Sequence, residues 1–185
     1  MTATVHTPTK DYLAALDASH ERLVPGGVVV SEQGWALASQ ARLPQGSVVA
    51  DALAALGGGQ PSAPELRAAF SERLAALHRR AIADVLALAM RRLDQRSSEG
   101  ANLLNRQLVQ GSVADVALAL TEADDLLALP GTPARLANVL RLLVNAGRTA
   151  VKLHGASGFL ADGPGTLVYL TELAGNTYFS EAGHD

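Results

Sequence analysis

The fold is decided by residues 66–95, which read LRAAFSERLAALHRRAIADVLALAMRRLDQ. Apolar residues recur three or four positions apart along this stretch, at Leu66, Phe70, Leu74, Leu77, Ala81, Val85 and Leu88. This spacing places them on one face of a helix, because an α-helix completes a turn in about 3.6 residues. The stretch therefore predicts one long amphipathic helix that buries its apolar face against other elements.

Three further amphipathic segments follow, and they are separated by strong helix breakers. The segments run from Leu104 to Leu127, from Leu136 to Leu153 and from Thr166 to about Tyr178. Gly100, the Leu129-Pro130-Gly131 break and the glycine-rich residues 155–165 separate them. Four amphipathic helices joined by short loops predict an all-α, up-down four-helix bundle over residues 65–185.

Residues 1–64 form a different region, which we interpret as an N-terminal extension. Thr9 to Leu23 predicts a helix, and Ser47 to Leu56 is interpreted as a short second helix. Val28 to Val30 is too short and isolated to predict a sheet, and we find no strand pattern in the extension. Residues 57–64, GGGQPSAP, read as a flexible linker or long loop before the bundle.

The composition narrows the class of protein. The chain has 185 residues, 48% hydrophobic and 18% charged, with a net charge of -3 and no cysteine. These values favour a folded domain without disulfides or thiolate metal sites, and no metal site is expected. They also predict no general attraction to nucleic acid or to an anionic membrane. With no signal-like N-terminus and no apolar run of about 18 residues, a cytoplasmic location is expected. The Ala- and Leu-rich usage is typical of a bacterial genome.

Two motifs inside the bundle resemble the acyl-CoA dehydrogenase family. Residues 96–115, RSSEGANLLNRQLVQGSVAD, are similar to the family segment in which a helix ends in an Arg and the next opens near a Gln. Residues 153–159, LHGASGF, are similar to a glycine-rich family turn. The resemblance covers roughly residues 66–180, the C-terminal domain of that family. It implies that FAD is contacted by Arg96, Gln107, Gln110, Gly155 and Gly158, partly across a subunit interface.

Two carboxylates are candidates for the catalytic base of that family, which removes the α-proton while the flavin accepts a hydride. Glu72, in the run Glu72-Arg73-Leu74, resembles one family position of the base, and Glu181 lies two residues beyond the other. The chain also departs from the family, since Glu99 stands where the family has an aromatic residue and Ala156 where it has a glycine.

Simpler interpretations exist for several of these residues. Arg96 lies at a predicted helix end, where a cation is favoured in any protein. Gln107 and Gln110 share a helix face and could bind a cofactor or face a partner. His154 at a helix end is expected to contact the last carbonyls, and His78 is expected at the surface or its boundary.

Three functions are therefore predicted as alternatives. The first is a partner subunit of a flavin-dependent acyl-thioester dehydrogenase, since 64 residues leave no room for the family's other two domains. The second is a bundle without flavin that acts as a cyclase or other proton-transfer enzyme on a bulky hydrophobic intermediate in natural-product biosynthesis. The third is a non-catalytic assembly protein. All three predict an oligomer, either of copies of this chain or with a dehydrogenase-like chain.

Overall fold

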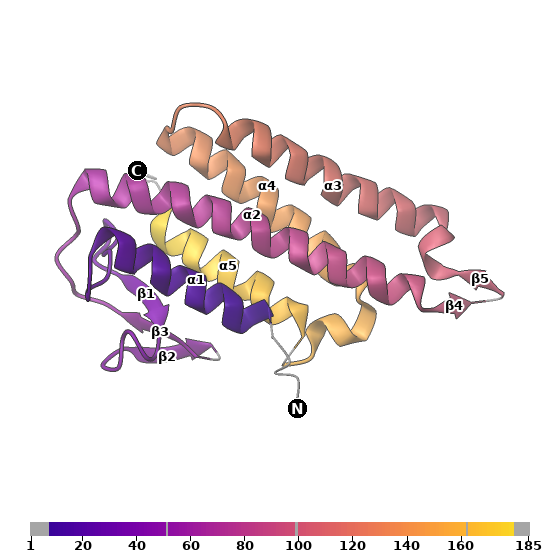
Figure 1. Ribbon diagram of the computed structural model, residues 1–185, viewed down its shortest axis with the longest axis horizontal. Coiled ribbons are helices and arrows are strands. Elements are labelled where there is room, and N and C mark those ends of the chain that lie inside the picture. The colour runs from indigo at the N-terminus through magenta and orange to yellow at the C-terminus, as the bar shows by residue number, and fades with distance from the viewer. Residues whose placement is uncertain (1–7, 51, 99, 162, 180–185) are drawn as a thin grey trace.

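The computed structural model describes residues 8–50, 52–98, 100–161 and 163–179. Its elements succeed one another along the chain as shown in Figure 1. The N-terminal region contains α1 (Pro8–Leu23), β1 (Ala36–Ser39), β2 (Ser47–Ala50) and β3 (Leu53–Leu56). The remainder contains α2 (Pro64–Asp94), β4 (Ser97–Ser98), β5 (Ala101–Asn102), η1 (Leu103–Asn105), α3 (Gln107–Leu127), α4 (Pro133–Leu153), η2 (Gly155–Phe159) and α5 (Pro164–Tyr178).

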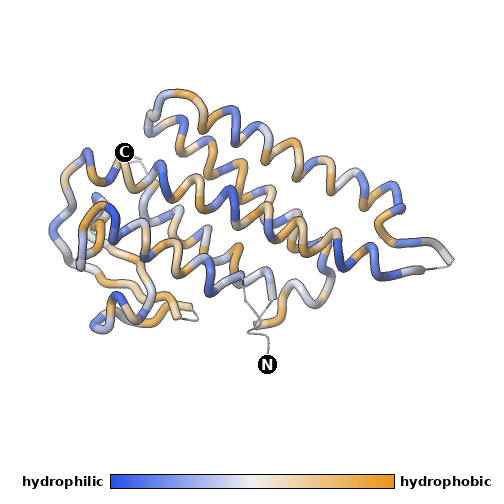
Figure 2. Tube along the Cα trace, viewed as in Figure 1, coloured by the Kyte–Doolittle hydropathy of each residue, from blue (hydrophilic) through white to orange (hydrophobic). Residues whose placement is uncertain are grey.

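The predicted four-helix bundle is confirmed. Helices α2, α3, α4 and α5 run alternately up and down, and α2 is the longest of them (Figure 1). Hydrophobic and hydrophilic stretches alternate along the helices (Figure 2). Three of these helices begin at a proline, namely Pro64, Pro133 and Pro164. Proline suits a first helical position, because its fixed φ is already helical and it lacks only an N–H that would be unpaired there.

The buried faces of the helices form a single core. Phe70, Leu74, Ile82 and Val85 of α2 are fully buried, and they share one cluster with Leu143 of α4 and other side chains of α5 and α1. Helix α3 contributes less, with only Val116, Leu120 and Ala123 buried. The reason is its position, since α3 packs on α2 and α4 and leaves its outer side uncovered (Figure 1). None of the described helices is long and apolar enough to cross a membrane.

The short helix predicted from Ser47 to Leu56 is wrong, because this segment forms strands β2 and β3. β3 lies between β1 and β2 in an antiparallel sheet of order β1-β3-β2. Leu37 of β1 pairs with Ala55, and Val48 of β2 pairs with Ala54. The statement that the extension has no strand pattern is wrong for the same reason. Strands β2 and β3 pair as a hairpin of two four-residue strands, and strands this short carry too little alternation to be recognised from the sequence.

The extension is attached to the bundle by buried hydrogen bonds. The ring of His20 on α1 accepts a hydrogen bond from Val29 N–H at Nδ1 (3.0 Å) and donates from Nε2 to the Leu37 carbonyl (2.8 Å). The Tyr178 hydroxyl of α5 accepts from Leu37 N–H and donates to the Val29 carbonyl, at 2.9 and 3.0 Å. Phe70 of α2 stacks on His20 with ring centroids 4.4 Å apart. These contacts bring α1, the sheet, α2 and α5 together around one aromatic cluster.

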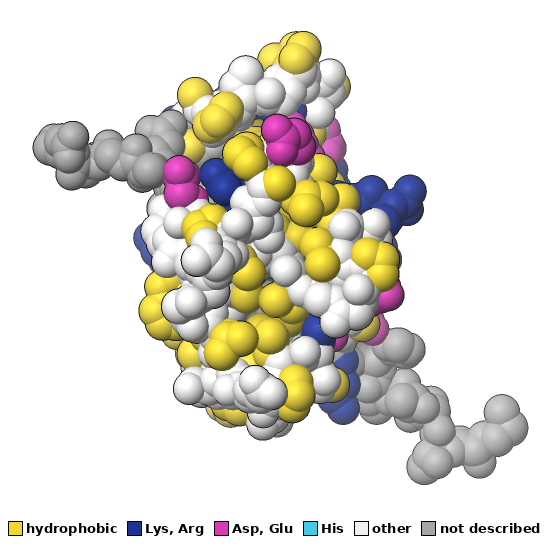
Figure 3. Space-filling model, turned by 90° about the vertical axis from the view of Figure 1, so that its left-hand side faces the viewer, with side chains coloured by type: hydrophobic (Ala, Val, Ile, Leu, Met, Phe, Trp, Pro, Cys, Tyr) yellow, Lys and Arg dark blue, Asp and Glu magenta, His cyan; other side chains and the backbone are white. Residues whose placement is uncertain are grey.

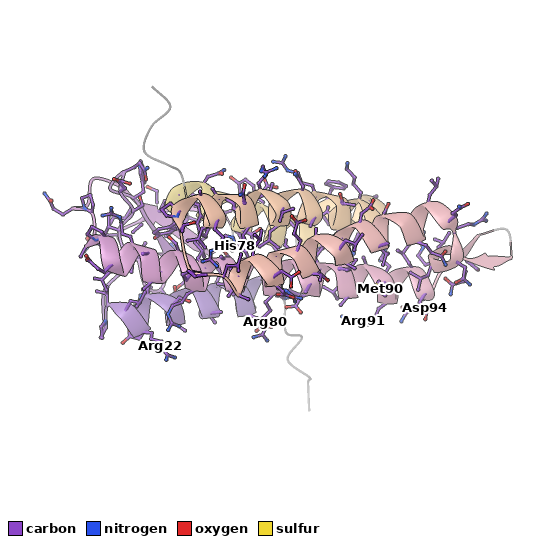
Figure 4. The ribbon with its side chains drawn as sticks, turned by 90° about the horizontal axis from the view of Figure 1, so that it is seen from above. Arg22, His78, Arg80, Met90, Arg91 and Asp94 are labelled. Carbon is purple, nitrogen blue, oxygen red and sulfur yellow. The ribbon has the colours of Figure 1, made fainter. Side chains whose placement is uncertain are left out.

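A second buried contact joins α1 to the middle of α2. The Tyr12 hydroxyl lies 3.0 Å from His78 Nε2, and both side chains are almost fully buried. Figure 4 shows His78 pointing into the molecule, whereas Arg80 and Arg91 of the same helix point outward. The expectation of a surface position for His78 is therefore wrong. The residue interrupts an apolar stripe, and its ring is buried between Tyr12 of α1, which lies within hydrogen-bond distance, and the ring of Phe179 after α5, with centroids 6.0 Å apart.

The connection between the sheet and α2 is fixed to the sheet region. Gly59 N–H donates to the Gly34 carbonyl at 3.0 Å, and the Ser62 hydroxyl accepts from Val30 N–H at 2.9 Å. Gly34 has a φ of +80°, which favours glycine at this turn. Residues 57–63 therefore form a loop that is held against the sheet region. The glycines and prolines of this segment serve the turns of the loop.

We expect Tyr12→Phe to lower the free energy of unfolding by about 1–3 kcal/mol, because His78 loses its buried partner while little volume changes. Urea unfolding monitored by circular dichroism measures the effect. Tyr169→Phe is the matched control, since Tyr169 is half exposed, and it should change the free energy by less than about 0.5 kcal/mol. Equal effects of the two substitutions would contradict the structural role of the Tyr12–His78 contact.

The two buried histidines predict a stability that falls with acid. Burial lowers the pKa of His20 from 6.5 to about 4 and that of His78 to about 3. Below pH 6.5 the unfolded chain binds protons that the folded chain does not, so each histidine lowers the free energy of unfolding by about 1.4 kcal/mol per pH unit down to its folded pKa. Urea unfolding at several pH values between 7 and 4.5 checks this. In the Tyr12→Phe, His78→Leu double variant, the free energy of unfolding should fall less steeply with decreasing pH, because the contribution of His78 is gone. A His20 ring that titrates near pH 6.5 in the folded protein, followed by NMR, would contradict the prediction.

Candidate functional site

A hollow lies along α4 and α5, and we name it the α4–α5 groove. Its volume is about 660 Å³, within the range of about 300–1,000 Å³ that is typical of small-molecule sites. The groove is bounded by α4, η2, the start of α5 and the end of β2. It is lined by Ala50, Arg148, Val151, Lys152, Gly158, Phe159, Leu160, Ala161, Gly165, Thr166, Val168, Tyr169 and Glu172.

Glycines in η2 and α5 bring the backbone close enough to form one end of the groove. Gly155 has a φ of +61°, which ends α4 and turns the chain. A Cβ atom on Gly158 would lie 2.7 Å from the Val151 carbonyl oxygen, and one on Gly165 would lie 2.4 Å from the Gly158 carbonyl oxygen. Both glycines are therefore required for packing. The turn leaves Phe159 72% exposed, so a large apolar ring stands at the rim of the groove.

The charged groups of the groove come from facing positions on α4 and α5. The Arg148 guanidinium donates two hydrogen bonds to the Glu172 carboxylate, each 2.9 Å long, and the bonds raise the pKa of Arg148. Lys152 lies one turn after Arg148 on α4. Its ammonium has no ion-pair partner among residues 8–50, 52–98, 100–161 and 163–179. The groove thus combines apolar walls, one neutralised ion pair and one available cation.

His154 has a structural contact between helices. Its Nε2 lies 3.0 Å from the Val85 carbonyl oxygen of α2, and the side chain is buried. The sequence predicts a contact with the last carbonyls of its own helix, but the ring crosses to α2. His154 therefore fixes the end of α4, and with it the η2 turn, to the central helix.

The residues that the family resemblance assigns to FAD do not come together in the α4–α5 groove. Arg96, Gln107 and Gln110 are exposed around the β4–β5 hairpin and the start of α3. Of the five predicted residues, only Gly158 lines the groove, and Gly155 lies beside it at the end of α4. Arg96 and the two glutamines can form at most one wall of a flavin site. The described residues do not fit a flavin site confined to a single chain.

Glu72, predicted as a catalytic base, lies near the opposite end of α2. Some 24 helical positions separate it from Arg96, or about 36 Å at 1.5 Å per residue. Its carboxylate accepts a hydrogen bond from Arg135 Nη2, and Arg135 Nη1 donates to the Leu126 and Leu129 carbonyls at 2.8 and 2.9 Å. Glu72 therefore helps to hold the α3–α4 connection. Glu181, the other predicted base, and Glu99 lie outside the described residues.

The sequence analysis missed the charged residues of the groove. Arg148 and Lys152 are four positions apart, and Tyr169 and Glu172 are three apart, so each pair occupies one side of its helix. That spacing is visible in the sequence. The sequence does not show that these sides of α4 and α5 face the same groove. That arrangement depends on how α5 packs after the η2 turn.

The fold is that of an acyl-CoA dehydrogenase bundle. A chain of the solved "Tcur3481-Tcur3483 steroid ACAD G363A variant" superposes on this protein with a TM-score of 0.55 and 20% sequence identity. The match covers 69% of this chain and 39% of that chain. No protein-family model matches the sequence, and no curated protein matches it. The predicted resemblance is thus confirmed at the level of the fold, and this chain spans well under half of the dehydrogenase chain.

Because Glu72 forms an ion pair with Arg135, we expect that removing the charge of this predicted catalytic base destabilises the fold. Arg135 is 6% exposed and Glu72 is 37% exposed, so Glu72→Gln should lower the free energy of unfolding by about 1–2 kcal/mol, less than for a fully buried pair. Glu172→Gln is the matched control in the more exposed pair with Arg148, and about 0.5 kcal/mol or less is expected there. Chemical denaturation measures both. A fully stable Glu72→Gln protein would show that the pair does not support the α3–α4 connection.

Proposed function

We propose that this chain is a subunit of an acyl-CoA dehydrogenase-like assembly, in which a partner chain supplies the rest of the catalytic site. The partner is a dehydrogenase-like chain or a further copy of this one. The assembly acts on an acyl thioester with a bulky hydrophobic acyl group. FAD, where present, is held between the two chains, with Arg96, Gln107 and Gln110 on this side.

The observation that carries this proposal is the position of Arg96, Gln107 and Gln110. They retain the order of the family motif, yet they lie exposed around the β4–β5 hairpin and the start of α3, outside the α4–α5 groove. A polar cluster of this kind binds a cofactor only when another surface covers it.

The surface also supports association with another chain. Trp35, Val48 and Val49, in and just before the sheet, are between 41% and 50% exposed. Figure 3 views the molecule from the end that carries the sheet and shows hydrophobic side chains spread over that face with few charges. On α3, Leu108 and Leu118 are 88% and 68% exposed. Large exposed apolar groups at several sites favour burial in an assembly.

The neighbour's name describes a steroid dehydrogenase, and this motivates the bulky substrate class proposed here. A second candidate function is a flavin-free proton-transfer enzyme such as a cyclase. It is favoured by one observation, the apolar α4–α5 groove with the Glu172 carboxylate in its wall. A non-catalytic assembly role is the outcome if neither flavin nor an apolar ligand binds.

The proposal is tested by the visible absorbance of the protein after incubation with FAD and removal of free flavin. The chain alone should retain little flavin. A complex of this chain with a dehydrogenase-like partner chain that co-purifies with it should retain a stoichiometric amount, and Arg96→Ala in that complex should weaken FAD binding about tenfold, the loss of a charge-assisted contact. Arg91→Ala, five residues earlier and also exposed in the last turn of α2, is the matched control and should have no effect.

Light scattering after size-exclusion chromatography provides the second readout. We expect a complex or an oligomer. A monomer that binds FAD tightly by itself would contradict the need for a partner, and a monomer that binds neither FAD nor the second chain would remove the subunit proposal.

A further inference from the structure

We propose that the α4–α5 groove binds a small molecule with an apolar body and an anionic head group, and that Lys152 pairs with the head group. This inference goes beyond the proposed subunit role, because it requires neither flavin nor a partner chain. Its test therefore succeeds or fails independently of that role.

The walls of the groove provide the apolar part of the site. Phe159, Leu160 and Tyr169 are 72%, 64% and 51% exposed, and Val151 and Val168 form the buried base beneath them. An apolar ligand in the groove would remove this surface from water and gain about 25 cal/mol for each Å² covered. The volume of about 660 Å³ accommodates a long chain or a fused-ring body.

The charges at the groove select the head group. Arg148 is engaged by Glu172 through two hydrogen bonds, so its charge is largely neutralised. Lys152 lines the same groove and forms no ion pair within the described part of the chain. An ammonium on a flexible stem beside an apolar hollow can reach an anion at the rim while the body of the ligand stays in the groove. A carboxylate or a phosphate supplies the same interaction.

A small molecule suits the groove better than a second copy of this chain. The hollow is open to solvent and lies between α4, α5, η2 and the Ala50 end of β2, so a small molecule in it contacts all four elements. Among the residues that the structure describes, the lining carries two cations, Arg148 and Lys152, and one carboxylate, Glu172. Two copies meeting groove to groove would bring these excess positive charges together, whereas an anionic ligand complements them.

The experiment is a titration of ¹⁵N-labelled protein with decanoate and, separately, with its uncharged counterpart 1-decanol. The amide signals of Gly158, Phe159 and Tyr169 should shift on addition of decanoate, and the titration gives the Kd. Lys152→Met keeps the apolar stem and removes the charge. It should weaken decanoate binding about five- to tenfold, as expected for a charge-assisted contact at a partly exposed site, and leave 1-decanol within about twofold.

Two further variants separate binding from folding. Arg141→Met removes a cation from α4 that is exposed and paired with Asn138 away from the groove, so both affinities should be unchanged. Glu172→Gln removes the carboxylate and releases Arg148, so decanoate should bind about two- to fivefold more tightly while 1-decanol is unaffected. A variant that misfolds cannot strengthen the binding of one ligand alone.

Three results would overturn the proposal. Shifts confined to other parts of the molecule would place the ligand elsewhere. An equal loss of decanoate and 1-decanol affinity in Lys152→Met would show that only the stem of the lysine packs there. Shifts of Phe159 and Tyr169 with protein concentration, in the absence of either probe, would show that a second copy covers the groove. The same titration with decyl phosphate, compared with decanoate, distinguishes a preference for a phosphate head group from one for a carboxylate.

Discussion

The structure depends on the burial of helix α2, which contacts all four of the other helices. Its apolar stripe runs from Phe70 to Leu93, and each fully buried Phe, Leu, Ile or Val side chain along it contributes about 1.5–3 kcal/mol. Two of its polar groups are used to join other elements, since His78 receives Tyr12 of α1 and the Val85 carbonyl receives His154 of α4. Because these contacts lie in the core, they fix which element lies beside α2 as well as stabilising it.

The groove follows from this arrangement. His154 holds the C-terminal end of α4 on α2, and the chain then has to turn within a few residues to begin α5. Glycines at 155, 158, 163 and 165 allow that turn, and their close packing leaves no space in which to bury Phe159 and Leu160. The apolar rim is therefore a consequence of the tight turn, and the same turn sets Arg148 opposite Glu172.

The two ends of α2 differ in what they support. Near its N-terminus, Glu72 and Arg135 hold the α3–α4 connection, so a carboxylate there has a structural partner. Beyond its C-terminus, Arg96 and the first turn of α3 stay exposed, without a covering surface in the described chain. This asymmetry distinguishes a position that the bundle uses itself from one that is available to a partner, which motif order alone does not reveal.

The sequence by itself determined the bundle, because four long segments with helical periodicity and clear breakers need no information beyond their own spacing. It also determined the likeness of residues 96–115 and 153–159 to a known family. Only the tertiary structure decided that Ser47–Leu56 forms strands, that His78 is buried and that Arg148, Lys152 and Glu172 share one groove. Each of these depends on a partner distant in the sequence: β1 for β3, Tyr12 for His78 and α5 for α4. Local patterns report which face of an element is apolar, and they do not report what that face will meet.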